Sequence, residues 1–156
     1  MAELKLGDKA PEFSLIAQDG KEYSLKKLSG KKIVLYFYPE DDTPTCTKQA
    51  CAFRDQYSEI QKKGAVVIGV SPNNTISHEK FSKKYRLTFP LVSDENKSVM
   101  KSYGVWKQKQ LFGRKYIGVV RTTFIINERG IITHIFPKVR VKGHAEKILH
   151  ALHEAP

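Results

Sequence analysis

The chain contains two cysteines, Cys46 and Cys51, which stand five positions apart in the segment 43–51 (TPTCTKQAC). Two cysteines are too few for a disulfide framework, and in a reducing compartment such a pair is more often catalytic than structural. In an ideal α-helix, Cα atoms five positions apart are about 8.6 Å from each other, whereas a disulfide needs Cα atoms closer than about 7 Å. One helix can therefore hold both thiols reduced, and a bond between them requires its first turns to unwind. The spacing predicts a redox switch.

The start of that helix favours negative charge on the sulfur of Cys46. We predict Thr43 as the N-cap and Pro44 as the first helical residue, which places Cys46 third in the first turn. Unpaired backbone N–H groups and the positive end of the helix dipole stabilise a thiolate there. Cys51 lies one and a half turns farther on, and we expect it to be the more ordinary and more buried thiol. Cys46 is therefore predicted to attack and Cys51 to resolve, while an alternative in which both are small hydrophobic residues packed in a helix stays open.

Hydrophobic patterning predicts the elements that hold this segment. The apolar runs 33–38 and 65–70 have the composition of buried strands, and apolar residues at helical spacing between 50 and 60 predict a helix that ends near Gly64. These elements form a β-α-β unit, whose strands are expected to be parallel. Because sites in such sheets lie beyond the carboxyl ends of the strands, residues 39–46 are the expected site.

The rest of the chain continues the alternation of strands and helices. Helices are predicted at 76–85, 96–103 and 144–153, a strand at 89–92, and hairpins at 13–17 with 21–25 and at 122–126 with 131–136. This order predicts an α/β protein with a central mixed sheet flanked by helices and an N-terminal β-hairpin. Since no linker, repeat or low-complexity segment interrupts the pattern, we expect residues 1–156 to form a single domain.

Composition limits the partners and the location. The net charge is +11, and it is uneven, with a net charge of +1 for residues 1–78 and +10 for residues 79–156. The lysines are dispersed and no nucleic-acid motif accompanies them, so a solvated basic surface is expected, with a basic nucleic-acid-binding module as the alternative. The first residues lack the apolar core of a secretory signal, and no run reaches membrane-spanning length. We therefore expect a soluble, cytoplasmic protein with no membrane partner.

No cofactor or metal is expected from the motifs. The five histidines lie far from the cysteines in the sequence and lack the ligand spacing of zinc sites. The chain also has no phosphate-binding loop, no Gly-rich dinucleotide fingerprint and no serine-hydrolase elbow. The chemistry is therefore expected to depend on the two thiols alone.

The segment 39–46 (PEDDTPTC) resembles the peroxiredoxin signature, in which a proline is followed four residues later by a threonine and then, three residues on, by a cysteine. The continuation 49–55 (QACAFRD) is similar to the bacterioferritin comigratory protein, or peroxiredoxin Q, branch of that family. Similarity extends through 7–13 (GDKAPEF), 69–71 (GVS), 89–94 (FPLVSD), 103–106 (YGVW) and 121–126 (RTTFII). The resemblance covers nearly the whole chain.

The resemblance implies a thioredoxin-like fold and a thiol-dependent peroxidase that reduces hydrogen peroxide and organic hydroperoxides to water and alcohols. Peroxide would oxidise Cys46 to a sulfenic acid, Cys51 would resolve it as an intramolecular disulfide, and thioredoxin or a similar dithiol would reduce that bond. Thr43, backbone amides and Arg121 would hold the peroxide oxygens, and Pro39 would shield the sulfur. The resemblance also implies a monomer.

The chain departs from the family pattern at two positions. Gln49 stands where many members of the branch carry an acid, and Asn127 replaces a usual aspartate, but neither change removes a catalytic group that the resemblance implies. A thiol-disulfide oxidoreductase or redox sensor would use the same two cysteines, although those motifs usually keep two residues between them and this chain has four.

Overall fold

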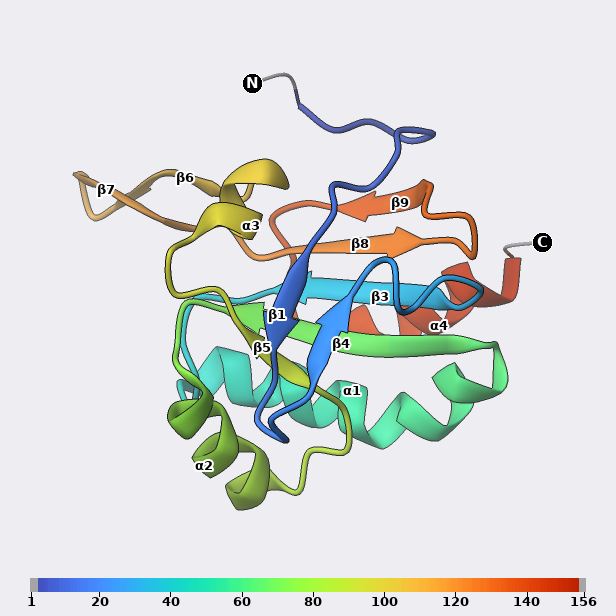
Figure 1. The fold of residues 1–156 in the computed structure, drawn as a ribbon. Coiled ribbons are helices and arrows are strands. Elements are labelled where there is room, and N and C mark those ends of the chain that lie inside the picture. Colours follow the sequence, from blue (N-terminus) through green and yellow to red (C-terminus); the bar gives the residue numbers. More distant parts are fainter. Residues whose placement is uncertain (1–2, 155–156) are drawn as a thin grey trace.

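The computed structural model describes residues 3–154 and has a five-stranded mixed sheet at its centre (Figure 1). β3 (Lys32–Phe37) is the middle strand, with β4 (Ala65–Ser71) parallel on one side and β8 (Thr122–Ile126) antiparallel on the other. β5 (Leu91–Ser93) pairs parallel with β4, and β9 (Ile132–Phe136) pairs antiparallel with β8. The predicted β-α-β unit and mixed sheet are confirmed. Because β3 and β8 are antiparallel, the end of β3 and the start of β8 meet at the same edge.

The helix that carries both cysteines is α1 (Pro44–Lys62), which begins at that edge and runs behind the sheet beside α4 (His144–Glu154) (Figure 1). Its large buried side chains, Phe53, Tyr57 and Ile60, lie from the middle of the helix to its end. The first turns bury only small or polar side chains, namely Cys46, Gln49 and Ala50. The predicted helical spacing is therefore confirmed, and the two halves of α1 differ in how firmly they are packed.

The remaining helices lie on either side of the sheet. α2 (Thr75–Tyr85) contributes Phe81 to the cluster on the α1 face. The other face is covered by the short α3 (Ser98–Ser102) and by the N-terminal hairpin of β1 (Ser14–Ile16) and β2 (Glu22–Ser24), which crosses in front of the sheet in Figure 1. Helices on both faces and an N-terminal hairpin were expected, and both are confirmed. No helix within residues 3–154 has the length and apolar character needed to cross a membrane.

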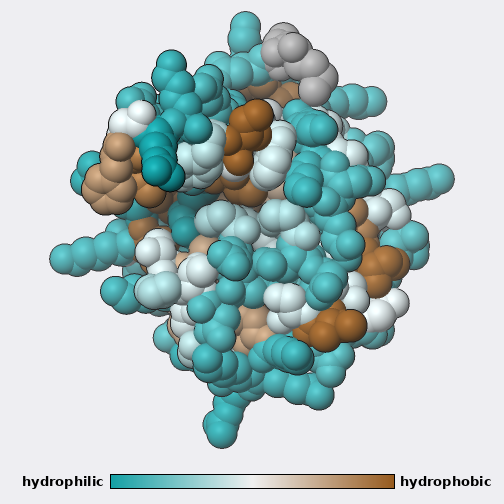
Figure 2. All heavy atoms as spheres, turned by 90° about the vertical axis from the view of Figure 1, so that its left-hand side faces the viewer, coloured by the Kyte–Doolittle hydropathy of each residue, from teal (hydrophilic) through white to brown (hydrophobic). Residues whose placement is uncertain are grey.

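A second hairpin, absent from the sequence-based expectation, projects from the edge where α1 begins. It consists of β6 (Trp106–Leu111) and β7 (Arg114–Val119), joined at Phe112 and Gly113, which both have positive φ. Most of its side chains are exposed, so it lacks the alternation of apolar and polar residues that identifies a half-buried strand. Figure 2 faces this side of the molecule, where brown and tan apolar groups interrupt a mostly hydrophilic surface.

Candidate active site

Cys46 lies in the first turn of α1, just beyond the carboxyl end of β3, and its side chain is buried. Thr43 occupies the N-cap position and Pro44 is the first helical residue, as predicted. The hydroxyl of Thr43 does not cap the helix, however, because it donates to the carbonyl oxygen of Glu40 at 3.0 Å. The first intrahelical bond runs from the Thr47 N–H to the Thr43 carbonyl, at 2.8 Å. The amide of Cys46 precedes that bond and is therefore not used by the helix.

Arg121 brings a positive charge to the sulfur. It immediately precedes β8, and its Nη2 donates to Sγ of Cys46 at 3.2 Å. Its Nη1 donates to Oε1 of Gln49 at 2.5 Å. The antiparallel pairing of β3 with β8 thus joins two residues that are remote in the sequence. The guanidinium thus places a positive charge and a hydrogen-bond donor beside the sulfur of Cys46.

Gln49 completes the contact between α1 and the guanidinium. It follows Cys46 by three positions, so both side chains lie on one side of the helix, and only 1% of Gln49 is exposed. Its Nε2 has no hydrogen-bond partner within the described residues, whereas its Oε1 accepts from Arg121. Gln49 was noted in the sequence only as a departure from the family pattern. The signal that would have assigned it to the site is its i+3 spacing from Cys46.

Cys51 differs from the sequence-based expectation. Both cysteines are free thiols on one continuous helix, but Cys46 is buried and Cys51 is only half-buried. The prediction that Cys51 is the more buried thiol is wrong. Five positions rotate the helix by about 140°, and Ala50, which is fully buried, takes the place on the core-facing side. Cys51 therefore lies at the boundary of the core and is partly exposed.

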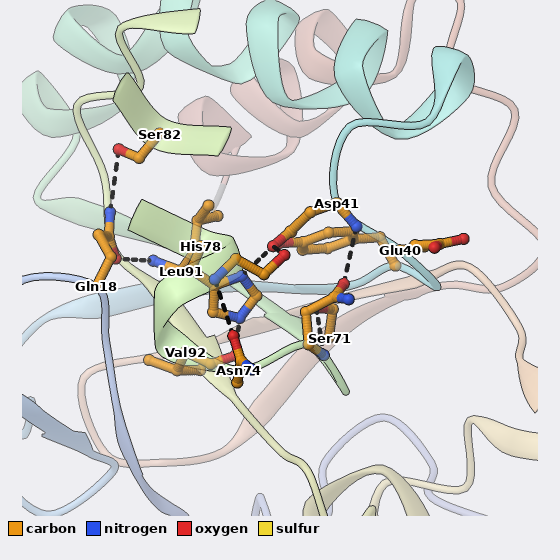
Figure 3. A network of polar contacts seen from close by, with 12 residues as sticks. Gln18, Glu40, Asp41, Ser71, Asn74, His78, Ser82, Leu91 and Val92 are labelled. Carbon is orange, nitrogen blue, oxygen red and sulfur yellow. Dashed lines mark hydrogen bonds and ion pairs between the residues drawn. The ribbon is translucent and has the colours of Figure 1, made fainter. Parts of the chain in front are cut away.

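The loop between β3 and α1 forms the other wall of the site. Pro39 is half-buried and follows Tyr38, whose hydroxyl donates to Oδ1 of Asp41 at 2.5 Å. The backbone N–H of Asp41 donates to Oδ1 of Asn73 at 2.8 Å. His78 from α2 lies against the same carboxylate, as Figure 3 shows. No role for Asp41 was predicted from the sequence, and His78 was considered only as a metal ligand, because these contacts join segments that no local pattern connects.

Two ionisable groups near the site are held neutral by burial. Burial raises the pKa of Tyr36 well above its ordinary value, and the neighbouring Cys46 and Asp41 raise it further. Burial also lowers the pKa of His144 to about 4, with Lys147 and Arg121 contributing as nearby positive charges. His144 is therefore neutral at pH 7, which leaves Arg121 as the cation beside the sulfur. Within residues 3–154, no group of three or more His, Cys, Asp or Glu side chains is placed to hold a metal.

Comparisons with known proteins identify the family of the chain. The model of the AhpC/TSA family matches residues 6–135. The chain is 48% identical to the putative peroxiredoxin Bcp of Coxiella burnetii over 149 residues, covering 96% of this chain and 99% of that protein. It is 40% identical to peroxiredoxin Bcp of Escherichia coli over 154 residues, covering 99% of each.

Solved structures give the same result. A cysteine-to-serine mutant of PrxQ from Xylella fastidiosa has a TM-score of 0.92 at 31% identity and covers 98% of both chains. The bacterioferritin comigratory protein of Xanthomonas campestris, solved in work on its alkyl peroxide reduction activity, has a TM-score of 0.86 at 35% identity and covers 90% of both chains. These similarities confirm the expected thioredoxin-like fold.

Proposed function

The chain belongs to the AhpC/TSA family and is a peroxiredoxin, a thiol-dependent peroxidase that acts on peroxides with a thiol reductant, and on this basis we propose that Cys46 is the cysteine that peroxide oxidises. The observation that carries this assignment is the 3.2 Å contact between Nη2 of Arg121 and the buried Sγ of Cys46. It supplies both a cation for the thiolate and a donor beside the atom that reacts. Cys51 has no such contact among those described.

In the proposed first step the thiolate of Cys46 attacks the distal oxygen of a peroxide ROOH. The S–O bond forms while the O–O bond breaks, the sulfur becomes a sulfenic acid, and the alkoxide takes up a proton and leaves as ROH. The guanidinium of Arg121 and the free amide of Cys46 stabilise the negative charge that develops on the leaving oxygen. The Thr43 hydroxyl proton is engaged by Glu40, so the Thr43 oxygen is left to accept a hydrogen bond from the peroxide. Pro39 limits access of water to the sulfur.

In the proposed second step Cys51 attacks the sulfenic sulfur, releases water and forms an intramolecular disulfide. The intact helix holds the two Cα atoms about 8.6 Å apart, which exceeds the separation of about 7 Å that a disulfide tolerates. The weakly packed first turns of α1 must therefore unwind, which their small buried side chains favour. A dithiol such as thioredoxin then reduces the disulfide and the helix re-forms.

The proposed substrates are hydrogen peroxide and organic hydroperoxides. The alkyl peroxide reduction activity named for the Xanthomonas relative supports the second class. We further propose that the protein acts as a monomer in the cytoplasm. Size-exclusion chromatography with light scattering tests the first of these statements, and cell fractionation tests the second.

The experiment that tests the assignment compares peroxide consumption by the pre-reduced wild type, Cys46→Ser and Cys51→Ser, with mass spectrometry of both cysteines after one equivalent of peroxide. We expect no activity from Cys46→Ser, a trapped sulfenic acid on Cys46 in Cys51→Ser, and an intramolecular disulfide in the wild type. Peroxide consumption by Cys46→Ser at the wild-type rate would contradict the assignment.

A further inference from the structure

The loop that forms one wall of the site, residues 38–43, is held by a buried carboxylate. The side chain of Asp41 is 3% exposed, and its two oxygens lie within hydrogen-bond distance of three side chains (Figure 3). Oδ1 accepts from the hydroxyl of Tyr38 at 2.5 Å, and Oδ2 accepts from the hydroxyl of Ser77 at 2.8 Å. Nδ1 of His78 lies 2.7 Å from the same Oδ2. Both carboxyl oxygens of Asp41 are therefore engaged, and neither has a hydrogen bond to Cys46 within residues 3–154.

His78 lies between the carboxyl group of Asp41 and a backbone carbonyl group. Its side chain is fully buried, and its Nε2 lies 3.1 Å from the carbonyl oxygen of Val92, which can only accept a hydrogen bond. Its Nδ1 faces Asp41, which already accepts two hydrogen bonds from hydroxyl groups. The side chain of His78 therefore bridges the buried carboxyl group of Asp41 and the backbone of β5. Because both side chains are buried, removing either one leaves a polar group of the other without its partner.

The contacts that hold Asp41, here called the anchor, are made outside α1, the helix that carries the cysteines. Asp41 is held by Tyr38, by the 71–74 loop through Asn73, and by Ser77 and His78 at the start of α2. None of these partners belongs to α1. When the first turns of α1 unwind, the contacts of Asp41 can stay in place.

A second, exposed contact joins the same loop to the other end of α2. Asp42, whose φ is +58°, accepts from Nζ of Lys84 and from the hydroxyl of Tyr85, each at 2.8 Å. Lys84 and Asp42 are both well exposed, and an ion pair in water contributes little. This contact offers a matched control, because it links the same loop to the same helix without burial.

We propose that Asp41 and His78 are a pair of positioning residues that keep residues 38–43 in the geometry of the peroxide site while the first turns of α1 unwind and re-form. The inference rests on the proposed role of Cys46. Thr43 and Pro39 then keep the positions that the next peroxide requires. The helix can re-form from Pro44 because the preceding loop has not moved. Loosening the pair displaces this wall, which slows oxidation of Cys46. Loosening the pair also makes the helical conformation of the first turns of α1 less stable. Cys51 should therefore reach the sulfenic acid at least as fast as in the wild type.

The test measures the two steps separately in His78→Gln, Asp41→Asn and the double variant. The rate constant for oxidation of Cys46 is obtained by competition with a second peroxidase, and disulfide formation is followed by quenched-flow alkylation and mass spectrometry. We expect oxidation to slow by about 10-fold in each single variant, because small misplacements of reacting groups have effects of this size. The double variant should resemble the single ones, since both remove the same anchor. Disulfide formation should not slow.

Two controls separate positioning from general loss of stability. Lys84→Gln removes the exposed contact and should leave both rates unchanged. Ile132→Val weakens the core on the opposite face of the sheet and should lower the melting temperature. It should not slow oxidation of Cys46 relative to disulfide formation. The inference is wrong if His78→Gln oxidises at the wild-type rate, or if both steps slow together as thermal stability falls. Failure of the proposed function would look different, because Cys46 of the wild type would then not be the residue that peroxide oxidises.

Discussion

Arg121 and Cys46 are joined by a 3.2 Å hydrogen bond from Nη2 to Sγ, although they are 75 positions apart in the sequence. The contact depends on the pairing of Phe37 with Thr122, which sets the start of β8 beside the end of β3. Because side chains alternate between the two faces of a strand, a shift of one residue in this register would turn the guanidinium away from the sulfur. The sheet register is thus part of the active site.

Replacing Arg121 with lysine is expected to lower kcat/KM for peroxide by about 100-fold, because an ammonium cannot make the two parallel contacts of a guanidinium. Gln49→Ala should have a smaller effect, about 10-fold, since it removes only the acceptor that orients the guanidinium. Steady-state assays with a saturating dithiol measure both effects. Arg129→Lys, a change in the turn before β9, serves as the control. Wild-type kcat/KM in Arg121→Lys would show that charge alone suffices.

The stacked side chains of Tyr36 and Tyr38 should respond in opposite ways to loss of the hydroxyl group. The hydroxyl of Tyr36 is buried and has no partner within the described residues, so Tyr36→Phe should leave the free energy of unfolding unchanged or raise it by about 1 kcal/mol. Tyr38→Phe removes a donor to the Asp41 carboxylate and should cost about 1–3 kcal/mol. Urea denaturation of the two variants in parallel measures the difference. Equal losses would contradict the prediction.

Gly69 is required by close packing rather than by its backbone angles. A Cβ atom at this position would lie 2.8 Å from Cδ2 of Leu91 and 2.9 Å from Cζ of Tyr36. Gly69→Ala should therefore destabilise the fold by about 1–3 kcal/mol through overpacking. Adding Leu91→Val should relieve part of the clash, so the double variant should lose less than the sum of the two single changes. Additive losses in chemical denaturation would show that the clash is not with Leu91.

His144 should make the protein less stable in mild acid. Burial lowers its pKa in the folded state to about 4, whereas it is about 6.5 in an unfolded chain. The unfolded chain therefore binds the proton more readily between these values, and the contribution of neutral His144 is complete above pH 6.5 and lost as the pH falls towards 4. We expect a loss of about 2 kcal/mol between pH 7.5 and pH 5 from this residue.

The measurement is urea denaturation of the wild type and His144→Gln at both pH values. The variant also loses the contact between Nε2 of His144 and the hydroxyl of Thr123, so its stability at pH 7.5 is the proper reference. Its loss on acidification should be smaller than that of the wild type by about 2 kcal/mol. Parallel losses in the two proteins would place the proton on another group.

Local patterns predicted most of the fold. Buried strands such as β3 and β4 and the amphipathic second half of α1 carry apolar periodicity that is visible within a few residues. The β6–β7 hairpin was missed because its side chains are largely exposed and its turn, at Phe112 and Gly113, lacks the usual Asn-Gly signal. The two strands are held mainly by their pairing with each other, and the sequence of either strand alone does not show that pairing.

The site was predictable in part. The neighbourhood of Cys46 followed from helix geometry, while the family resemblance alone pointed to Arg121. The contacts of Gln49, Asp41 and His78 depend on three-dimensional packing, as does the limited burial of Cys51. Contacts between side chains of separate helices, strands and loops produce no periodic pattern in the sequence.

The uneven packing of α1 has a consequence for amide hydrogen exchange. Residues after Phe53 are tied to the core by large apolar side chains, whereas residues 45–51 are held mainly by small or polar ones. Within one continuous helix, the first segment should exchange through brief local opening and the second only when the whole protein unfolds. The protein would then carry two thermodynamic units in a single helix, and the boundary between them would fall just after the second cysteine.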